Sequence, residues 1–203
     1  MTRHAHWQAV YEGKAETEVS WFQERPASSL ALIHATGLGA DARIIDIGGG
    51  ASRLIDHLLD QDYRSIAVLD IAQAALEKTR RRLGVHADTV EWLVADVTQW
   101  MPSGQFDIWH DRAVFHFLAD PSDRKAYAAA MAAAVPTGGY AIVGTFALDG
   151  PERCSGLPVR RYDADALAAE FSPHFQLVET LAEDHITPGG KMQRFQFCRM
   201  WRV

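Results

Sequence analysis

Three aspartates stand at or near the ends of three short apolar runs in this 203-residue chain. The first run, residues 43–47, contains Asp46 and leads into three glycines, residues 48–50. The second run ends in Asp70, and the third ends in Asp96. A glycine turn lets the backbone approach a ligand, and a carboxylate at a strand end can accept hydrogen bonds from both ribose hydroxyls of a nucleoside. An acid after the third run can accept a hydrogen bond from an adenine amino group. Asp46, near the end of the first run, is suited to bind a ligand with a cationic group.

A fourth apolar run leads into a polar exit. Residues 106–118 read FDIWHDRAVFHFL, which places His110, Asp111 and Arg112 where the strand is expected to end. Ligands in open α/β sheets bind outside the carboxyl ends of the strands, so we expect these three side chains to line a reaction cleft. We predict that Asp111 orients a nucleophile and that His110 or His116 removes its proton.

The elements that position these residues alternate between strand and helix, which is typical of a parallel sheet with crossover helices. A C-terminal pair of strand-like runs around Pro188-Gly-Gly190 predicts an antiparallel hairpin. We therefore predict an α/β fold with a doubly wound, mostly parallel seven-stranded sheet and a C-terminal antiparallel hairpin. The expected strands are 43–47, 65–69, 90–95, 106–110, 140–146, 175–181 and 192–201, and the expected helices are 28–36, 51–59, 72–83, 122–135 and 163–171.

The glycine turn departs from the nicotinamide dinucleotide fingerprint. That fingerprint places a third glycine three residues after the second, and Arg53 occupies this position. A bulky side chain there fits poorly with close packing of helix on strand, which disfavours a nicotinamide-dependent oxidoreductase. A non-catalytic cofactor-binding module is a further alternative. The polar residues His110, Asp111 and Arg112 at the end of the fourth strand disfavour it, because a module that only binds a cofactor would not need them.

Composition excludes several classes of protein. The chain is 48% hydrophobic and 23% charged, with a net charge of -6 and a pI of about 5.8. A free-standing nucleic-acid binder normally carries a basic face, so we expect no nucleic-acid partner. The longest apolar stretch, residues 126–135, is too short to span a bilayer, so we expect no membrane association.

Cysteine and histidine spacing argues against a metal site. Cys154 and Cys198 lie far apart and form no CxxC pair, and His4 and His6 form the single HxH pair of the chain. We expect no bound metal. With no secretory leader recognisable, we expect a reducing, cytoplasmic setting.

The order of Asp46, Asp70 and Asp96 resembles that of the class I S-adenosylmethionine-dependent methyltransferases. The turn at residues 136–139, PTGG, is also similar to the usual P-x-G-G of that family. The resemblance implies that S-adenosylmethionine is the cofactor and that the glycine turn passes under its methionine part. It also implies that Asp70 holds the ribose and that Asp96 and its neighbour face the adenine. The predicted cofactor-binding residues are Trp21, Asp46, Gly48, Gly50, Asp70, Ile71, Asp96, Val97 and His110.

The Asp111-Arg112 pair looks like the Asp-Lys-Gly or Asp-Arg-Gly found at this point in a branch of protein-lysine methyltransferases. That branch acts on citrate synthase and on elongation factor 1 alpha, and this chain departs from it with Ala113 in place of the glycine. The resemblance implies methyl transfer to a nucleophilic acceptor, which could be a protein lysine. The alternative is a small-molecule N, O or S acceptor.

The chain length suits a single domain, residues 1–203. Trp7 and Tyr11 lie four residues apart and so share one helix face, and we expect them to fold over the cofactor as part of a lid. Packing of these aromatics in the core is the alternative. The expected parts are an N-terminal helical lid and first helix (1–42), a cofactor-binding core (43–146), and a substrate-side loop, helix and hairpin (147–203).

Overall fold

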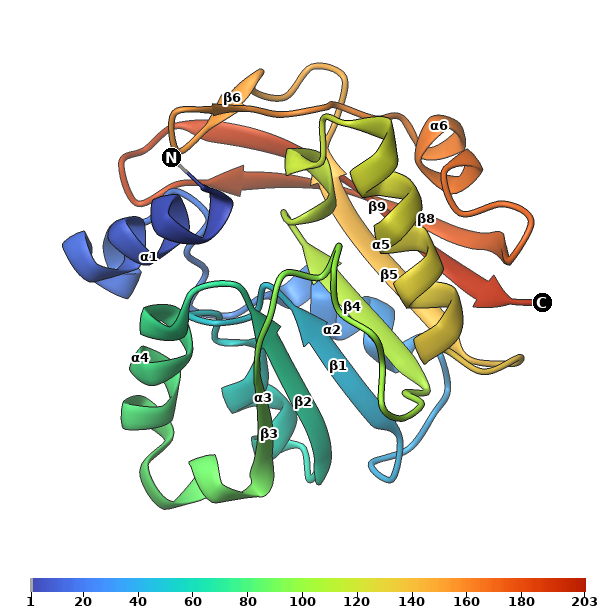
Figure 1. The fold of residues 1–203 in the computed structure, drawn as a ribbon, viewed down its shortest axis with the longest axis horizontal. Helices are drawn as coiled ribbons and strands as arrows, with labels where there is room; N and C mark the ends of the chain where they lie inside the picture. The colour runs from blue at the N-terminus through green and yellow to red at the C-terminus, as the bar shows by residue number, and fades with distance from the viewer. Residues whose placement is uncertain (1) are drawn as a thin grey trace.

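Seven strands pair into one sheet in the order β3-β2-β1-β4-β5-β9-β8 within residues 2–203, the part of the chain that the computed structural model describes. The first five run parallel to their neighbours, and β9 pairs antiparallel with both β5 and β8. The predicted α/β sheet with its C-terminal antiparallel hairpin is therefore confirmed (Figure 1). The strands are β1 (Arg43–Ile47), β2 (Ser65–Asp70), β3 (Val90–Val94), β4 (Ile108–Arg112), β5 (Tyr140–Phe146), β8 (Phe175–Ile186) and β9 (Met192–Arg202).

Helices cover both faces of the sheet. In Figure 1, α5 and α6 lie on the near face, and α2 and α3 lie behind it. Residues 2–203 also form three short 3₁₀ helices and a small hairpin of two strands with two residues each, β6 (Arg153–Cys154) and β7 (Leu157–Pro158). The helices are α1 (Arg3–Gly13), α2 (Ala27–His34), α3 (Leu54–Asp60), α4 (Gln73–Leu83), α5 (Pro121–Ala134) and α6 (Ala164–Ala169), with 3₁₀ helices η1 (Glu16–Glu18), η2 (Gly84–Thr89) and η3 (Phe115–Phe117).

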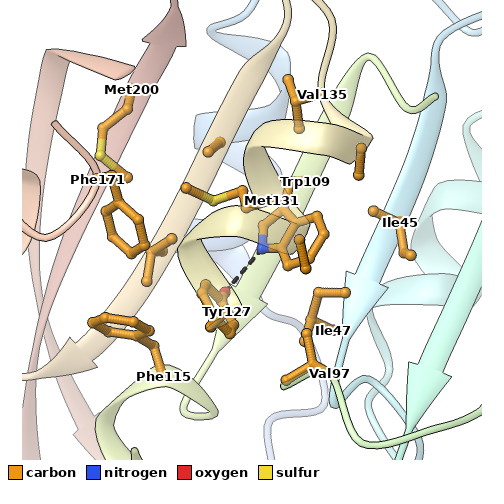
Figure 2. Close-up of a cluster of buried hydrophobic side chains, with 14 of the residues drawn as sticks. Ile45, Ile47, Val97, Trp109, Phe115, Tyr127, Met131, Val135, Phe171 and Met200 are labelled. Carbon is orange, nitrogen blue, oxygen red and sulfur yellow. Dashed lines mark hydrogen bonds between the residues drawn. The ribbon is translucent and has the colours of Figure 1, made fainter. Parts of the chain in front are cut away.

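The central strands are apolar on both sides because each face carries its own hydrophobic cluster. The cluster under α5 and α6 includes Trp109, Tyr127 and Phe171, which lie together in Figure 2. The indole N–H of Trp109 donates to the Tyr127 hydroxyl at 2.9 Å, so the one polar atom of this large side chain is satisfied. The cluster on the other face packs α2 and α3 on the sheet, with Ile44 and Leu54 among its members.

Local signals fix several helix ends. Asp120 accepts from the backbone N–H of Ser122 at 2.8 Å and caps α5, which has Pro121 at its first position. Asp163 caps α6 by accepting from the backbone N–H of Ala166 at 2.8 Å. Gly84 ends α4 with a φ of +57°, a left-handed conformation that glycine adopts readily.

Two predicted elements are displaced in the structure. β4 runs from Ile108 to Arg112, two residues later than the predicted 106–110, because it stays paired with β1 as far as Ile47 and Asp111. His110, Asp111 and Arg112 therefore lie within the strand and not after it. α3 begins at Leu54, three residues later than predicted, after the glycine turn. Within residues 2–203 no helix is both long enough and apolar enough to cross a membrane.

Candidate active site

Two adjoining clefts lie at the carboxyl ends of β1, β2 and β4. The larger holds about 750 Å³ of empty space, part of it open to solvent, and the smaller holds about 520 Å³. This is the edge at which ligands bind in open α/β sheets, because the chain leaves neighbouring strands there in opposite directions. Both clefts share Tyr11, Trp21, Ile47, Gly48 and Arg112.

The glycine turn is shaped by its surroundings. Gly48 has a φ of +67°, and a Cβ atom there would lie 2.1 Å from a methyl group of Val114. At Gly50 a Cβ atom would meet both Ala75 and the Asp70 carboxylate at 2.5 Å. The backbone N–H of Gly50 instead donates to Asp70 Oδ2 at 3.1 Å. Gly50 thus lies behind the cleft wall and lets α4 and the carboxylate approach the turn.

Asp70 presents a buried carboxylate to the larger cleft. Its side chain also accepts from the N–H of Ala72 at 2.8 Å, and burial raises its pKa to about 6. Each carboxylate oxygen has a second lone pair, so the group can still accept from two ligand hydroxyls. Ile71 follows it in the same wall.

Asp96 lies at the far end of the larger cleft with Val97. Its Oδ1 atom accepts from the backbone N–H of Thr98 at 3.0 Å and from the Thr98 hydroxyl at 2.7 Å. Its Oδ2 atom lies 3.5 Å from the guanidinium of Arg3, which comes from α1 and also lines the cleft. The structure thus brings Asp70 and Asp96, which lie at or just after the ends of neighbouring strands, into one cavity.

Asp46 lines the smaller cleft with His110 and Ser29. Its Oδ1 atom lies 2.7 Å from His110 Nδ1, and its Oδ2 atom is buried without a hydrogen-bond partner among the residues described. Arg53 lines the same cleft, and its buried Nε likewise has no partner in residues 2–203. The Arg53 guanidinium is paired through another nitrogen with Glu16 at 2.7 Å, so one carboxylate oxygen of Asp46 and one N–H of Arg53 are left without a partner among the described residues, on two side chains that line the same cleft.

Aromatic side chains form the outer wall of the larger cleft. The ring of Trp7 meets Phe117 edge-on at 4.9 Å and Trp21 at 5.8 Å between centroids. Trp21 in turn lies 6.1 Å from Tyr11, whose pKa is raised well above its usual value by burial. As the sequence predicts, Trp7 and Tyr11 lie on one face of a helix. That helix is α1, and it covers the cleft.

Arg112 ties this wall to the C-terminal hairpin. Its guanidinium donates to the Trp21 carbonyl at 2.9 Å and to Glu183 Oε1 at 3.0 Å, and it lies 4.3 Å from the centre of the Phe195 ring. The side chain is nearly buried, with 10% exposed, and its charge is paired with Glu183. Arg112 therefore holds the segment that carries Trp21.

Asp111 departs from its expected place in the cleft. Successive residues of a strand point to opposite faces, so Asp111 points away from His110 and Arg112 into the cluster under α5. It accepts from Val114 N at 2.8 Å, Phe115 N at 3.0 Å and the Tyr127 hydroxyl at 2.6 Å, and it lines neither cleft. In this position Asp111 binds the backbone of the turn after β4.

His116 also lies outside both clefts. Its Nδ1 atom accepts from the backbone N–H of Phe146 at 3.3 Å, and the ring is fully buried. Burial, together with the charge of Arg112, lowers the pKa of His116 to about 3. The ring is therefore neutral at ordinary pH, and it packs beside Phe117 and Phe146.

The turn after β4 contains a strained residue. Ala113 has a φ of +74°, the left-handed region that favours glycine, and it lines the larger cleft. This is the position at which the protein-lysine methyltransferase branch has glycine. The backbone of this chain keeps the conformation that the glycine would allow and adds a methyl group to the cleft.

Sequence reasoning missed two polar residues of the clefts, Arg3 and Ser29. Arg3 lies in the segment predicted as a helical lid but was not singled out, and Ser29 reads as an ordinary residue in the first turn of a helix. Neither belongs to a recognisable motif, because tertiary packing alone brings them to the strand ends. Within the described residues, 2–203, no group of three or more His, Cys, Asp or Glu side chains is placed to hold a metal ion.

Comparison with known proteins supports the resemblance found in the sequence. A family model described as "Methyltransferase domain" matches residues 44–139, the segment that carries the glycine turn and the three acids. No curated protein sequence matches the chain significantly.

Solved structures share the whole fold. A structure from work on conversion of a disulfide bond into a thioacetal group during echinomycin biosynthesis is 21% identical, with 98% of this chain and 93% of that chain covered and a TM-score of 0.78. The N-methyltransferase NodS from Bradyrhizobium japonicum WM9, in complex with S-adenosyl-L-homocysteine, is 13% identical over 99% of both chains, with a TM-score of 0.74. The 1,6-didemethyltoxoflavin-N1-methyltransferase from Burkholderia thailandensis is 19% identical over 98% of this chain and 84% of that one, with a TM-score of 0.69. The family match falls on residues that build the clefts, and solved methyltransferases share the fold around them.

Proposed function

We propose that this chain is an S-adenosylmethionine-dependent methyltransferase, and that it methylates a small acceptor held in the larger cleft beneath α1, in preference to a lysine of a folded protein. The observation that carries this proposal is the aromatic wall formed by Trp7, Trp21 and Phe117, which closes the cleft from the N-terminal side. A flat apolar molecule can stack within such a wall, whereas a lysine on a protein surface needs an open approach. One of the similar structures contains bound 1,6-didemethyltoxoflavin, which is a small molecule and not a protein.

We assign the cofactor to the two clefts from the donors and acceptors that face them. Asp70 receives the ribose hydroxyls, and Asp96 with Val97 receives the adenine. In the smaller cleft the free Oδ2 atom of Asp46 receives the ammonium group of the methionine part, and Arg53 Nε donates to its carboxylate. The fit rests on these buried, unpartnered polar atoms, which a zwitterion would satisfy.

The cofactor, when bound, supplies a sulfonium methyl group for direct in-line displacement. What the protein adds is orientation and the exclusion of water, and orientation alone can contribute on the order of 7–11 kcal/mol. Asp96 and Asp46 would hold the two ends of the cofactor, and Asp70 would hold its ribose. Trp21 and Phe117 shield the acceptor side, where an apolar wall favours a transition state in which charge disperses.

The acceptor we propose is a nucleophile that needs no general base, such as a ring nitrogen or a thiolate. Of the three predicted catalytic side chains, Asp111 and His116 make their hydrogen bonds outside the clefts. His110 is held between Asp46 and Ser29 at 2.7 and 2.9 Å. Because these side chains are already held by hydrogen bonds, they support a methyl transfer in which positioning of the acceptor against the methyl group is the main catalytic factor.

The test is transfer of label from S-[methyl-³H]adenosylmethionine to a cell extract that has been separated into protein and small-molecule fractions. We expect a labelled small molecule other than the donor itself with the wild-type enzyme and none with Asp70→Ala, which lacks the proposed ribose acceptor. Label in the protein fraction alone, again dependent on Asp70, would overturn the small acceptor in favour of a protein side chain. Binding of S-adenosylhomocysteine by calorimetry serves as the control for cofactor recognition.

A further inference from the structure

A buried chain of hydrogen bonds joins three elements behind the smaller cleft. Ser29 on α2, His110 on β4 and Asp46 on β1 are each at most 2% exposed. The Ser29 hydroxyl lies 2.9 Å from His110 Nε2, and His110 Nδ1 lies 2.7 Å from Asp46 Oδ1. Neighbouring parallel strands place Asp46 and His110 at the same level of the sheet.

The direction of these hydrogen bonds follows from the chemistry of the groups. An ionised carboxylate only accepts, so His110 Nδ1 carries a proton and donates to Asp46. In a neutral imidazole the other nitrogen then accepts, and the Ser29 hydroxyl donates to it. In this arrangement both ring nitrogens of His110 have a hydrogen-bond partner, which holds the ring in one orientation.

This series of hydrogen bonds uses one carboxylate oxygen of Asp46, Oδ1, and leaves the other, Oδ2, without a partner in the described residues. Oδ2 is buried and has no hydrogen-bond partner among residues 2–203, although its cleft is lined by polar groups. Gly49 makes room for this oxygen, because a Cβ atom there would lie 2.1 Å from it. An unpaired buried carboxylate oxygen is costly unless a donor arrives from a ligand.

We propose that Ser29 and His110 are positioning residues that hold the Asp46 carboxylate with Oδ2 directed at the ammonium group of the cofactor. The proposal rests on the placement of that ammonium group in the smaller cleft under the proposed function. Ser29 is fully buried in the first turn of α2, so its hydroxyl acts on the imidazole. Rotation of the imidazole, once the Ser29 bond is lost, would let the carboxylate turn away from the ligand.

The experiment compares two ligands by isothermal titration calorimetry. S-adenosylhomocysteine carries the ammonium group, and 5′-methylthioadenosine has the same nucleoside without it. We expect Asp46→Asn to weaken S-adenosylhomocysteine binding at least tenfold, and Ser29→Ala and His110→Asn to weaken it three- to tenfold. Binding of 5′-methylthioadenosine should change less than twofold in all three variants.

Matched variants separate positioning from a general loss of structure. Ser28→Ala changes the neighbouring serine of α2, which makes no bond to His110, and should bind both ligands as the wild type does. Ser29→Thr keeps the hydroxyl and should retain S-adenosylhomocysteine affinity. Should the alanine variant not fold, Ser29→Cys keeps the side-chain volume while donating more weakly, and the same ligand comparison applies.

The possible failures are distinguishable. If Ser29→Ala and His110→Asn weaken both ligands equally, or neither, while Asp46→Asn selectively weakens S-adenosylhomocysteine, then the positioning proposal is wrong and the ammonium site stands. If Asp46→Asn leaves S-adenosylhomocysteine affinity unchanged, then the placement of the ammonium group is wrong and the positioning proposal is overturned with it.

Discussion

Asp111 is the acceptor of three hydrogen bonds inside the cluster under α5. Two of its donors are backbone N–H groups of the turn after β4, Val114 and Phe115, and the third is the Tyr127 hydroxyl. Burial raises the pKa of Asp111 to about 6, and these hydrogen bonds oppose that rise. Since the turn supplies part of the larger cleft, Asp111 acts on the site through the backbone.

At this residue we predict that Asp111→Asn destabilises the protein. The amide can accept through one oxygen only, and its NH₂ group would face a backbone N–H, so at least one buried donor loses its partner. The expected loss in the free energy of unfolding is about 2–4 kcal/mol, since a buried donor to a charged group is left unpaired. Urea unfolding at pH 7 measures it.

The control for Asp111 is the same substitution at a helix cap. Asp120 accepts from Ser122 at the exposed start of α5, and asparagine caps helices as well as aspartate does. Asp120→Asn should therefore change the free energy of unfolding by less than about 1 kcal/mol. Equal losses in the two variants would contradict the role assigned to Asp111.

Among the elements, α1 is held over the cleft by the packing of Trp7 and Tyr11 and by polar contacts to α4 and α5. Arg3 pairs with Asp123 of α5 at 2.7 Å, and the Gln8 side chain accepts from the N–H of Ala74 in α4 at 3.2 Å. The Arg3–Asp123 pair is partly exposed, with 35% and 29% of the two side chains accessible, so it stabilises the closed position only slightly. We propose that α1 is a lid that must open when the cofactor exchanges.

We predict that Asp123→Asn loosens this lid. Loss of a partly exposed ion pair costs roughly 0.3–1 kcal/mol, which corresponds to a two- to fivefold higher population of the open form. Amide hydrogen exchange in residues 3–13 should accelerate by that factor, and bound labelled S-adenosylhomocysteine should dissociate faster in a chase with unlabelled ligand.

Asp149→Asn is the comparison for the lid. Asp149 pairs with Arg194 at the same distance, 2.7 Å, on the loop after β5, and it lines neither cleft. Loss of the Asp149–Arg194 pair should leave both the amide hydrogen exchange rate in residues 3–13 and the rate of ligand dissociation unchanged. If Asp123→Asn leaves the dissociation rate at the wild-type value, α1 does not limit release.

The elements also show which features could be predicted from the sequence. The strands 43–47 and 140–146 are found at the predicted residues, because each is a buried apolar run between clear turn signals. β4 was displaced because its polar residues, His110 and Asp111, are buried by partners that come from distant segments. A motif places a residue on a strand, whereas the face it points to depends on register, and this is why the expected cleft position of Asp111 failed.

On the scale of the whole molecule, several ionisable groups are enclosed with opposite effects on acid stability. Burial raises the pKa values of Asp70 and Asp111 to about 6, so their contribution to stability falls as the pH rises from about 4 to 6. Burial lowers the pKa of His116 from 6.5 to about 3. Below pH 6.5 the unfolded chain binds a proton at this histidine and the folded chain does not, so acid weakens the fold through His116.

We predict that His116→Asn reduces the acid sensitivity of the protein. The amide oxygen can still accept from the N–H of Phe146, but the residue no longer titrates. Between pH 7 and pH 5 the wild type should lose about 2 kcal/mol of unfolding free energy through His116, whereas the variant should lack this part of the loss.

Urea unfolding of both proteins at pH 7 and pH 5 gives the four values needed. The asparagine is smaller than the ring it replaces, so we expect the variant to be less stable at pH 7, and only the difference between the two pH values tests the titration. Identical pH differences in the two proteins would show that His116 is not kept neutral by the fold.

The aromatic wall has a practical consequence for spectroscopy. Two of the six tryptophans, Trp7 and Trp21, face the larger cleft, one on the lid and one on the segment held by Arg112. Indole emission responds strongly to local polarity and to stacked purines. The protein therefore carries its own optical reporter of occupancy and lid position, and replacing each tryptophan by phenylalanine would separate the lid signal from that of the fixed wall.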